Sequence, residues 1–248
     1  KNTLLEIMKA AVNFYVGQLH GGGGTAAREY LTRRGLSAAV TKQFALGYAP
    51  DSWDALTTTF RDKFKAEDIF SAGLSISREK NQGFYDRFRH RIMFPIRDIH
   101  GNAVGFTSRL LDEKRAEGKY VNTPETPIYT KSRVLYGLDL AREAIRKQDY
   151  AIAVEGNMDV IACHQFEMTN VVAASGTAFT LEHVRLLKRY TNNLMISFDA
   201  DAAGQTAAKR GIDLALGEGM RVKVVVLPEG CGKDPDDCVR KNIKAWRG

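Results

Sequence analysis

Apolar positions follow two different periods along this chain, and the change comes near residue 90. Between residues 3 and 19 apolar side chains recur every three or four positions, which predicts an amphipathic helix. The glycines at 21–24 end it and predict a flexible connector, because no strand precedes them and no Gly-Lys-Ser/Thr follows. Further short helices, each closed by a glycine or a turn, are predicted at 26–34, 37–46, 52–64 and 66–72.

Alternation with a period of two begins at residue 92. The segments 92–96 and 104–108 flank a turn-forming stretch and predict a β-hairpin. Just before it, residues 85–91 interleave arginines with aromatic residues, a pattern suited to phosphate contacts supported by stacking. A solvated basic turn is the alternative. The segment 119–138 is irregular and carries Lys119 and Lys131.

From residue 150 onward, strands and helices alternate regularly. Strands are predicted at 150–154, 171–174, 193–198 and 221–227, and helices at 158–165, 181–190 and 202–216. Such alternation requires right-handed crossovers and a parallel sheet covered on both faces. The predicted class is therefore α/β: a mixed α+β first part followed by a small Rossmann-like domain.

The charge distribution separates the two parts further. The 248 residues carry a net charge of +7, and all of this excess lies in residues 1–149, which hold 24 basic and 17 acidic residues. Residues 150–248 hold 12 of each. This distribution, a basic part followed by a balanced part with clustered carboxylates, is typical of a nucleic-acid groove beside a metal site. The alternative is a basic surface that only keeps the protein soluble.

Composition excludes several other classes. With 44% hydrophobic and 26% charged residues, the chain is neither disordered, collagen-like nor a coiled coil. No apolar run is long enough for a membrane span and no signal peptide is visible, so we expect a cytoplasmic protein. The cysteines, at 163, 231 and 238, lack zinc-type spacing, and we expect them to be reduced thiols. Trp53 and Trp246 are expected to be packing residues.

Carboxylates follow three of the predicted strands. Glu155 ends the first, Asp199 and Asp201 end the third, and Asp234 and Asp236 follow the fourth. Functional groups gather beyond the carboxyl ends of parallel strands, because the loops there line a shared crevice. Helix N-capping explains one such aspartate but not all three clusters.

Carboxylates brought together raise each other's pKa unless a cation lies among them. Mg²⁺ is the expected cation, with Mn²⁺ as a substitute, because it prefers oxygen ligands and the phosphate oxygens of a substrate. The predicted metal ligands are Glu155, Asp199, Asp201, Asp234 and Asp236.

These motifs resemble, in order, the TOPRIM domain of bacterial DnaG-type primases. The resemblance rests on Glu155-Gly156-Asn157-Met158-Asp159-Val160, Ala174-Ser175-Gly176-Thr177, Phe198-Asp199-Ala200-Asp201-Ala202-Ala203-Gly204 and Asp234-Pro235-Asp236-Asp237. The upstream half resembles the basic N-terminal subdomain of the same RNA polymerase core, through residues 87–98, 105–106, 119–127 and 131–138. The chain departs from the family pattern at Asn157, usually aromatic, at Ala200, usually glycine, and at Asp237, commonly glutamate.

The resemblance implies a domain organisation. It places the basic N-terminal subdomain at residues 1–148 and the TOPRIM metal-binding subdomain at 149–248. The family's zinc-binding module, the helical bundle that completes the core and the helicase-binding domain are not recognisable, so we expect a fragment without zinc.

The resemblance also implies an activity: primer synthesis, in which ribonucleoside triphosphates are joined on a single-stranded DNA template during replication by metal-dependent nucleotidyl transfer. Glu155, Asp199 and Asp201 would be the catalytic residues, with Glu155 a metal ligand or the general base. The candidates for binding template or nucleotide are Arg87, Arg89, Arg109, Lys119 and Lys131. The replicative helicase and the single-stranded DNA-binding protein would be partners of the full-length bacterial protein outside this fragment, which we expect to be monomeric.

Two rival functions remain at this stage. A TOPRIM topoisomerase or nuclease would cleave nucleic acid, although a topoisomerase needs a nucleophilic tyrosine on a separate domain. A catalytically idle module for binding nucleic acid or a regulatory nucleotide would gain nothing from keeping mutually repelling carboxylates.

Overall fold

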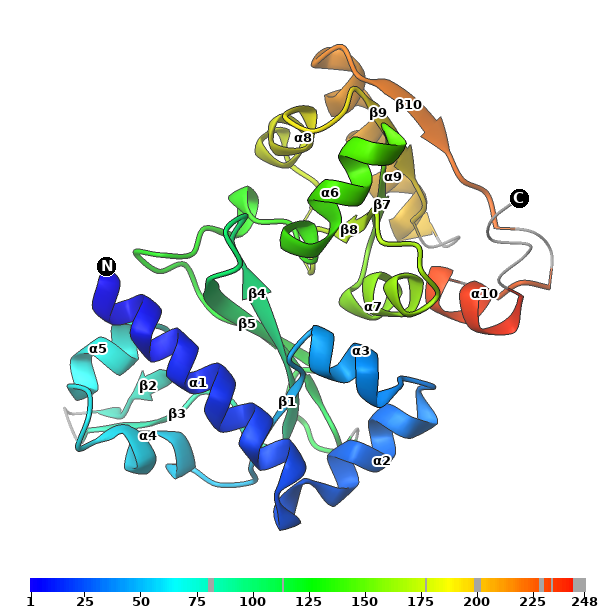
Figure 1. The fold of residues 1–248 in the computed structure, drawn as a ribbon. Helices are drawn as coiled ribbons and strands as arrows, with labels where there is room; N and C mark the ends of the chain where they lie inside the picture. The colour runs from blue at the N-terminus through cyan, green and yellow to red at the C-terminus, as the bar shows by residue number, and fades with distance from the viewer. Residues whose placement is uncertain are drawn as a thin grey trace. The chain divides into compact units, whose positions relative to one another are not determined.

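The structure is a computed structural model that describes residues 1–79, 83–112, 114–176, 178–198, 202–227, 230–232 and 234–242. The chain divides into two compact units (Figure 1). The first holds residues 1–96 and 102–130, and the second holds residues 97–101 and 131–248. The domain boundary predicted between residues 148 and 149 falls inside the second unit and stays a prediction.

The first unit combines short helices with two antiparallel sheets. Its helices are α1 (Asn2–His20), the 3₁₀ turn η1 (Gly22–Gly24), α2 (Thr25–Arg33), α3 (Ala38–Gln43), α4 (Ala55–Phe60) and α5 (Ala66–Ser71). Its strands are β1 (Gly47–Ala49), β2 (Ser75–Ser77), β3 (Phe84–Asp86), β4 (Arg91–Arg97), β5 (Ala103–Leu110) and β6 (Tyr120–Asn122). Strands β4 and β5 are neighbours in the sheet β1-β4-β5-β6, as the predicted hairpin requires, and β2 pairs with β3. The last residue of β4, Arg97, belongs to the second unit.

The core of the first unit lies under α1. Buried Ile7, Met8 and Tyr15 of this helix cluster with Met93 and Phe106 of the sheet. The three- and four-residue spacing of the apolar positions on α1 places them on one face, so the sequence periodicity accounts for this packing.

Glycine is required where α1 meets β1. A Cβ atom on Gly47 would lie 2.6 Å from the Cβ of Tyr15, closer than real Cβ atoms approach any neighbour. The backbone of β1 therefore packs directly against the helix, and a larger residue at position 47 would force the two apart.

The second unit alternates strands with helices. Its elements are η3 (Lys131–Arg133), α6 (Leu138–Gln148), β7 (Ala151–Val154), α7 (Asn157–Gln165), β8 (Val171–Ala173), α8 (Leu181–Lys188), β9 (Asn193–Ile196), α9 (Ala202–Gly217), β10 (Arg221–Val224) and α10 (Pro235–Lys241). The four strands form a parallel sheet in the order β10-β9-β7-β8 (Figure 1). The predicted mixed α/β class, with a parallel sheet in the second part, is confirmed.

Both faces of this sheet are apolar at its central strand, β7. Ala151 and Ala153 of β7 belong to a buried cluster with Ile145 of α6 and Leu187 of α8. Successive side chains of a strand point to opposite faces, so Ile152 and its alternate neighbours face the other way, and they too are buried. Burial on both faces explains why β7 and β8 are continuous apolar runs, whereas the edge strand β10 is mostly exposed and alternates charged with apolar residues.

No helix in the described ranges combines the length and the apolar character needed to cross a membrane.

Candidate metal centre and nucleic-acid surface

Glu155 lies at the carboxyl end of the central strand β7. It directly follows Val154 and precedes Gly156, the N-cap of α7. Its side chain is partly exposed, whereas Val154 before it is fully buried. The strand end therefore presents a carboxylate at the edge where the loops after β7, β8 and β9 begin.

Asp159 connects this strand end to the acidic segment far along the chain. Its Oδ2 accepts a hydrogen bond from the backbone N–H of Gly156 at 3.0 Å, and its Oδ1 accepts one from the N–H of Asp236 at 3.0 Å. Only 6% of Asp159 is exposed. Both donors lie at helix N-termini, where the helix dipole favours a carboxylate. Asp159 thus holds the loop containing Glu155 against α10.

Asp159 lies within one of the sequence motifs but was not among the predicted site residues. The available signal was an acidic residue three positions after a helix N-cap, a pattern typical of a capping box. That pattern predicts the bond to Gly156, but not the bond to a residue 77 positions away.

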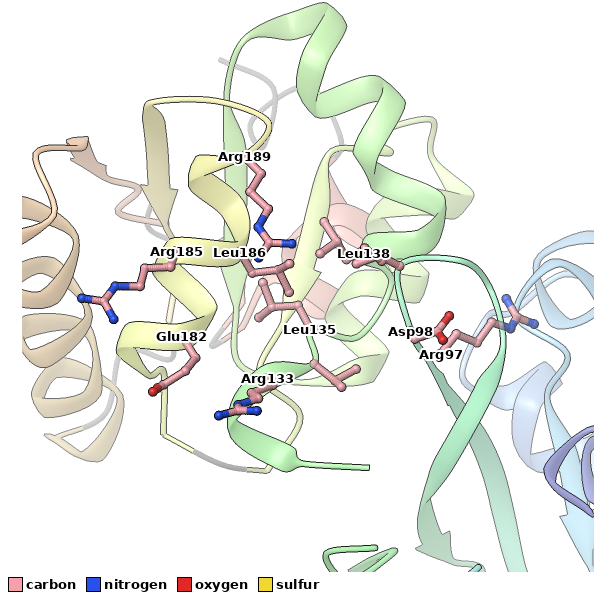
Figure 2. Close-up of a pocket in the computed structure, with 11 residues that line it drawn as sticks. Arg97, Asp98, Arg133, Leu135, Leu138, Glu182, Arg185, Leu186 and Arg189 are labelled. Carbon is pink, nitrogen blue, oxygen red and sulfur yellow. The ribbon is translucent and has the colours of Figure 1, made fainter. Parts of the chain in front are cut away.

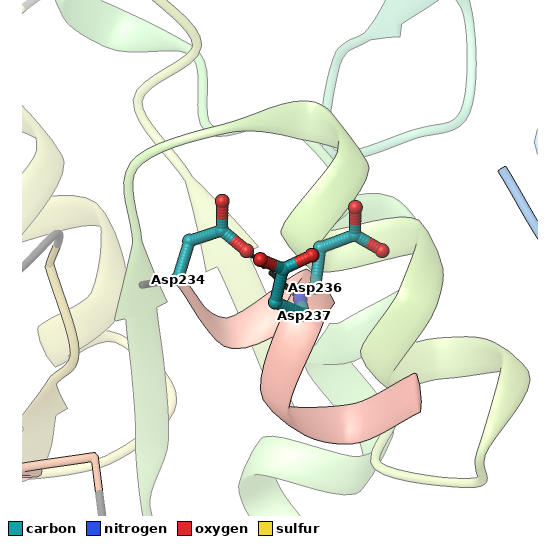
Figure 3. Close-up of side chains that lie close together, drawn as sticks. All are labelled: Asp234, Asp236 and Asp237. Carbon is teal, nitrogen blue, oxygen red and sulfur yellow. Dashed lines mark hydrogen bonds between the residues drawn. The ribbon is translucent and has the colours of Figure 1, made fainter. Parts of the chain in front are cut away.

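Asp234, Asp236 and Asp237 form a compact acidic group at the start of α10. One carboxylate oxygen from each lies within 4.8 Å of the others. Figure 3 shows the three side chains gathered at the start of the helix. Asp234 is the N-cap, and its side chain accepts a hydrogen bond from the N–H of Asp237 at 2.8 Å. Asp236 is buried, with 1% of its surface exposed.

Arg240 neutralises part of this group. Its guanidinium lies 2.9 Å from a carboxylate oxygen of Asp236 and 2.9 Å from one of Asp237. These are i,i+4 and i,i+3 pairs on one helix, so the helical repeat brings the charges together.

The donor set fits a hard divalent cation. Three carboxylates within a few ångströms of one another supply only oxygen ligands, which Mg²⁺ and Mn²⁺ accept. The nearby cysteine sulfurs are joined to each other, so no thiolate competes for the ion. Within the described residues this is the one group of three acidic, histidine or cysteine side chains close enough to hold a metal.

Asp199 and Asp201 lie outside the described residues, and their predicted roles stay predictions. The strand before them is described: the N–H of Ser197 donates to the carbonyl of Ala153 at 2.9 Å. β9 thus runs beside β7 almost to its carboxyl end.

The expectation of reduced cysteines is wrong for two of the three. Cys231 and Cys238 form a disulfide, with their Cα atoms 4.5 Å apart, and Cys163 is a buried free thiol. The pair was not predicted, because two cysteines seven positions apart do not match the Cys-x-x-Cys spacing of common paired-cysteine motifs. The pair is created by the fold, which turns the chain back onto the first turns of α10. We call residues 231–232 and 234–238, whose ends this disulfide joins, the acidic loop.

Asn157 and Ser175 meet beside Glu155. The Ser175 hydroxyl donates to Oδ1 of Asn157, and Ser175 has a positive φ of 52°. Non-glycine residues seldom adopt such a conformation and often do so at functional loops. The hydrogen bond joins the loop after β8 to the first turn of α7, at the position where the resembling family has an aromatic residue.

A cation–aromatic cluster occupies the surface of the first unit. The guanidinium of Arg89 lies 4.2 Å from the ring centroid of Trp53 and 5.5 Å from that of Tyr85, and the two rings are 5.3 Å apart. Trp53 is 59% exposed, so the expectation that it is a packing residue is wrong. Burial of Leu56 and Phe60 satisfies the apolar face of α4, and Trp53 lies before that helix on the outside.

The other predicted basic residues are not part of this cluster. Arg87 donates from Nε to the carbonyl of Gly73 at 2.8 Å, and Arg109 is 7% exposed with its guanidinium 4.9 Å from the Tyr30 ring centroid. Lys119 is exposed just before β6. Lys131 lies in the second unit, where its carbonyl contacts the ring Nε2 of His183 at 3.1 Å.

A pocket of about 420 Å³ also lies in the second unit. Figure 2 shows Arg133 and Arg189 flanking the apolar side chains of Leu135 and Leu186. None of the predicted site residues lines it, so this pocket is separate from the acidic group.

Comparison with protein families identifies the chain. Residues 14–142 match the family described as DNA primase catalytic core, N-terminal domain, and residues 152–239 match a Toprim-like family. The chain belongs to the DnaG primase catalytic core family. The match of the first part to a primase domain family argues against the topoisomerase and nuclease alternatives.

Primase relatives are similar over nearly the whole chain. The DNA primase of Synechococcus elongatus is 42% identical over 99% of this chain, and that of Escherichia coli K12 is 39% identical over 98%. The chain spans 36% and 42% of the lengths of these two relatives.

Solved primase cores share the fold. The RNA polymerase domain of Mycobacterium tuberculosis primase DnaG superposes with a TM-score of 0.90 at 39% identity, covering 100% of this chain and 81% of that one. A DnaG primase catalytic domain bound to single-stranded DNA gives a TM-score of 0.89 at 38% identity, covering 99% of this chain and 76% of that one. The Toprim-like half places this primase core in a metal-binding family, to which the acidic group at α10 conforms.

Proposed function

We propose that this chain is the catalytic part of a primase that joins ribonucleoside triphosphates into short RNA on a single-stranded DNA template. The observation that carries the proposal is the pair of hydrogen bonds made by Asp159. They hold the loop containing Glu155 against the helix that begins with Asp234 and Asp236. Carboxylates from two distant segments are thereby kept at one edge of a parallel sheet, which is where such folds carry chemistry.

The proposed reaction is an in-line attack of a ribose 3′-hydroxyl on the α-phosphate of the incoming nucleotide. Mg²⁺, or Mn²⁺ in its place, would lower the pKa of the hydroxyl and stabilise the pyrophosphate that leaves. Asp234 and Asp236 would hold the cation together with Asp199 and Asp201. Glu155, on the partly exposed strand end, would serve as a further ligand or accept the hydroxyl proton.

Asp159 and Arg240 would act through these ligands. The carboxylate of Asp159 orients the N-terminus of α10, while Arg240 fixes the rotamer of Asp236 through ion pairs at 2.9 Å. Partners of this kind set the orientation of metal ligands and tune their affinity.

The Arg89–Trp53–Tyr85 cluster would receive the DNA template. An exposed indole beside a guanidinium provides a face for stacking a base and a charge for the adjoining phosphate. Arg87, Arg109, Lys119 and Lys131 remain further candidates for template or triphosphate. A solved DnaG primase catalytic domain similar to this chain is bound to single-stranded DNA, which supports such a strand as the ligand.

We expect this chain to be monomeric and cytoplasmic. The replicative helicase and the single-stranded DNA-binding protein would contact segments of the full-length protein outside this chain.

The test is primer synthesis on single-stranded DNA with labelled ribonucleotides and Mg²⁺ or Mn²⁺. Glu155→Gln and Asp234→Asn should abolish the short RNA product, whereas the exposed control Glu143→Gln on α6 should leave it unchanged. The assay uses this chain and, in parallel, a longer form with the segments that its relatives possess. Absence of RNA from a folded longer form that still binds DNA would instead favour the binding-module alternative.

A further inference from the structure

The disulfide closes a ring of the chain that contains two of the proposed metal ligands, Asp234 and Asp236. Cys231 and Cys238 are seven positions apart, and Asp234, Asp236 and Asp237 all lie between them. Both cysteines are buried, with exposed fractions of 4% and 0%. The three carboxylates therefore belong to a segment whose two ends are covalently joined.

The two ends of the acidic loop pack tightly against each other. A Cβ atom on Gly232 would lie 2.4 Å from the Cβ of Asp237, and Gly232 has a φ of 122°, which side chains rarely allow. Within the first turn of α10, the N–H of Cys238 donates a hydrogen bond to the carbonyl of Asp234 at 3.1 Å. The chain at 231–232 is thus pressed against the first turn of α10, and the disulfide is the covalent bond that retains it there.

We propose that Cys231 and Cys238 are a redox-active pair whose disulfide preorganises the acidic loop for a divalent cation, so that reduction by a dithiol weakens cation binding. The inference rests on the proposed metal role of Asp234 and Asp236. Its physical basis is entropy, because opening the ring lets the carboxylates sample conformations that the closed loop excludes. Binding the cation must then reorder them.

The chemistry is a balanced thiol–disulfide exchange. A thiolate of the dithiol attacks Sγ of Cys231, which is the less buried of the two, and the bond to Cys238 breaks. The Cys238 thiolate takes up a proton. The second thiol of the reductant loses its proton and attacks the mixed disulfide, which releases Cys231 as a thiolate that is then protonated. Two electrons and two protons have moved to the protein, and the dithiol has become a disulfide.

Linkage makes the effect reciprocal. If the closed ring raises the affinity for the cation by some factor, the bound cation must stabilise the closed ring against reduction by the same factor. Because both sulfur atoms are buried, exchange also requires the loop to open, so a bound cation should slow the reduction as well.

The test measures Mn²⁺ binding by electron paramagnetic resonance on protein oxidised with glutathione disulfide and on protein reduced with dithiothreitol. Alkylation followed by mass spectrometry verifies the state of each cysteine. We expect the dissociation constant to rise about 10- to 100-fold on reduction, the range seen when supporting partners of metal ligands are lost. A Cys231→Ser/Cys238→Ser variant should match the reduced protein and ignore dithiothreitol, whereas Cys163→Ala should respond as the parent does.

The outcomes separate this inference from the proposed function. Equal Mn²⁺ affinity in verified oxidised and reduced protein, or failure of glutathione disulfide to join the cysteines, overturns the redox inference alone. Absence of Mn²⁺ binding in both states, or binding that persists in Asp234→Asn, overturns the metal role and the inference with it. Should the double variant fail to fold, the reduced parent protein provides the same comparison.

Discussion

Replacement of Asp159 tests the connection between the two acidic segments most directly. Its carboxylate accepts two backbone N–H groups at 3.0 Å each and is 6% exposed. A hydrogen bond to a charged acceptor contributes about 1.5–3 kcal/mol, and a buried N–H left without a partner is costly. Asp159→Asn keeps one acceptor oxygen and should lower the free energy of unfolding by about 2 kcal/mol, whereas Asp159→Ala loses both bonds and should lower it by about 4 kcal/mol.

The assay is urea unfolding of both variants, followed by hydrogen exchange and Mn²⁺ titration. The amides of Gly156 and Asp236 should exchange faster in the alanine variant, and Mn²⁺ affinity should fall because α10 is no longer held. Asp213→Asn, an exposed carboxylate on α9, is the matched control and should change stability by less than about 0.5 kcal/mol. An alanine variant with unchanged stability and unchanged exchange at these two amides would refute the bridging role.

Three further predictions concern other parts of the molecule. Burial lowers the pKa of His164 to about 4, so the unfolded state binds the proton more readily than the folded state. The free energy of unfolding should therefore decline as the pH falls from about 6.5 towards 4, by up to about 1.36 kcal/mol per pH unit. His164→Gln should remove that slope when urea unfolding is measured across this pH range. Trp53→Ala should weaken binding of labelled oligodeoxythymidylate in fluorescence anisotropy by about 1–3 kcal/mol, with Trp53→Phe retaining most of the affinity; equal binding by both variants would contradict stacking. Gly232→Ala places a Cβ 2.4 Å from that of Asp237, so Mn²⁺ affinity should fall in calorimetry, while Gly22→Ala, which meets nothing within 4 Å, should bind normally.

Apolar periodicity predicted most of the second unit correctly because its elements are set by short-range pattern. The predicted strand 150–154 and helix 158–165 differ by one residue from β7 and α7. Helices α6 and α10 were not predicted. Among the elements that were, the largest boundary difference is at the sheet edge, where 221–227 was predicted and β10 ends at residue 224. An edge strand has a neighbour on one side alone, so fewer hydrogen bonds extend it, and Val226 is 82% exposed.

The part of the candidate metal site that lies at the ends of parallel strands was predictable from the sequence. Glu155 and the aspartates of the acidic loop were expected at one edge because parallel strands present their carboxyl ends together. Trp53 was not predicted correctly, because an apolar residue next to a helix reads the same from sequence whether it faces the core or solvent.

Local chemistry therefore decides which residues form strands, which acids follow them and where the excess positive charge lies, since each depends on neighbours a few positions away. The bond from Asp159 to the N–H of Asp236 joins residues 77 positions apart, and the Cys231–Cys238 bond depends on the chain folding back against α10. Such contacts depend on how whole elements pack, and no periodicity or spacing records that packing. Tertiary structure alone joins the two cysteines and holds the strand end that carries Glu155 against the acidic loop.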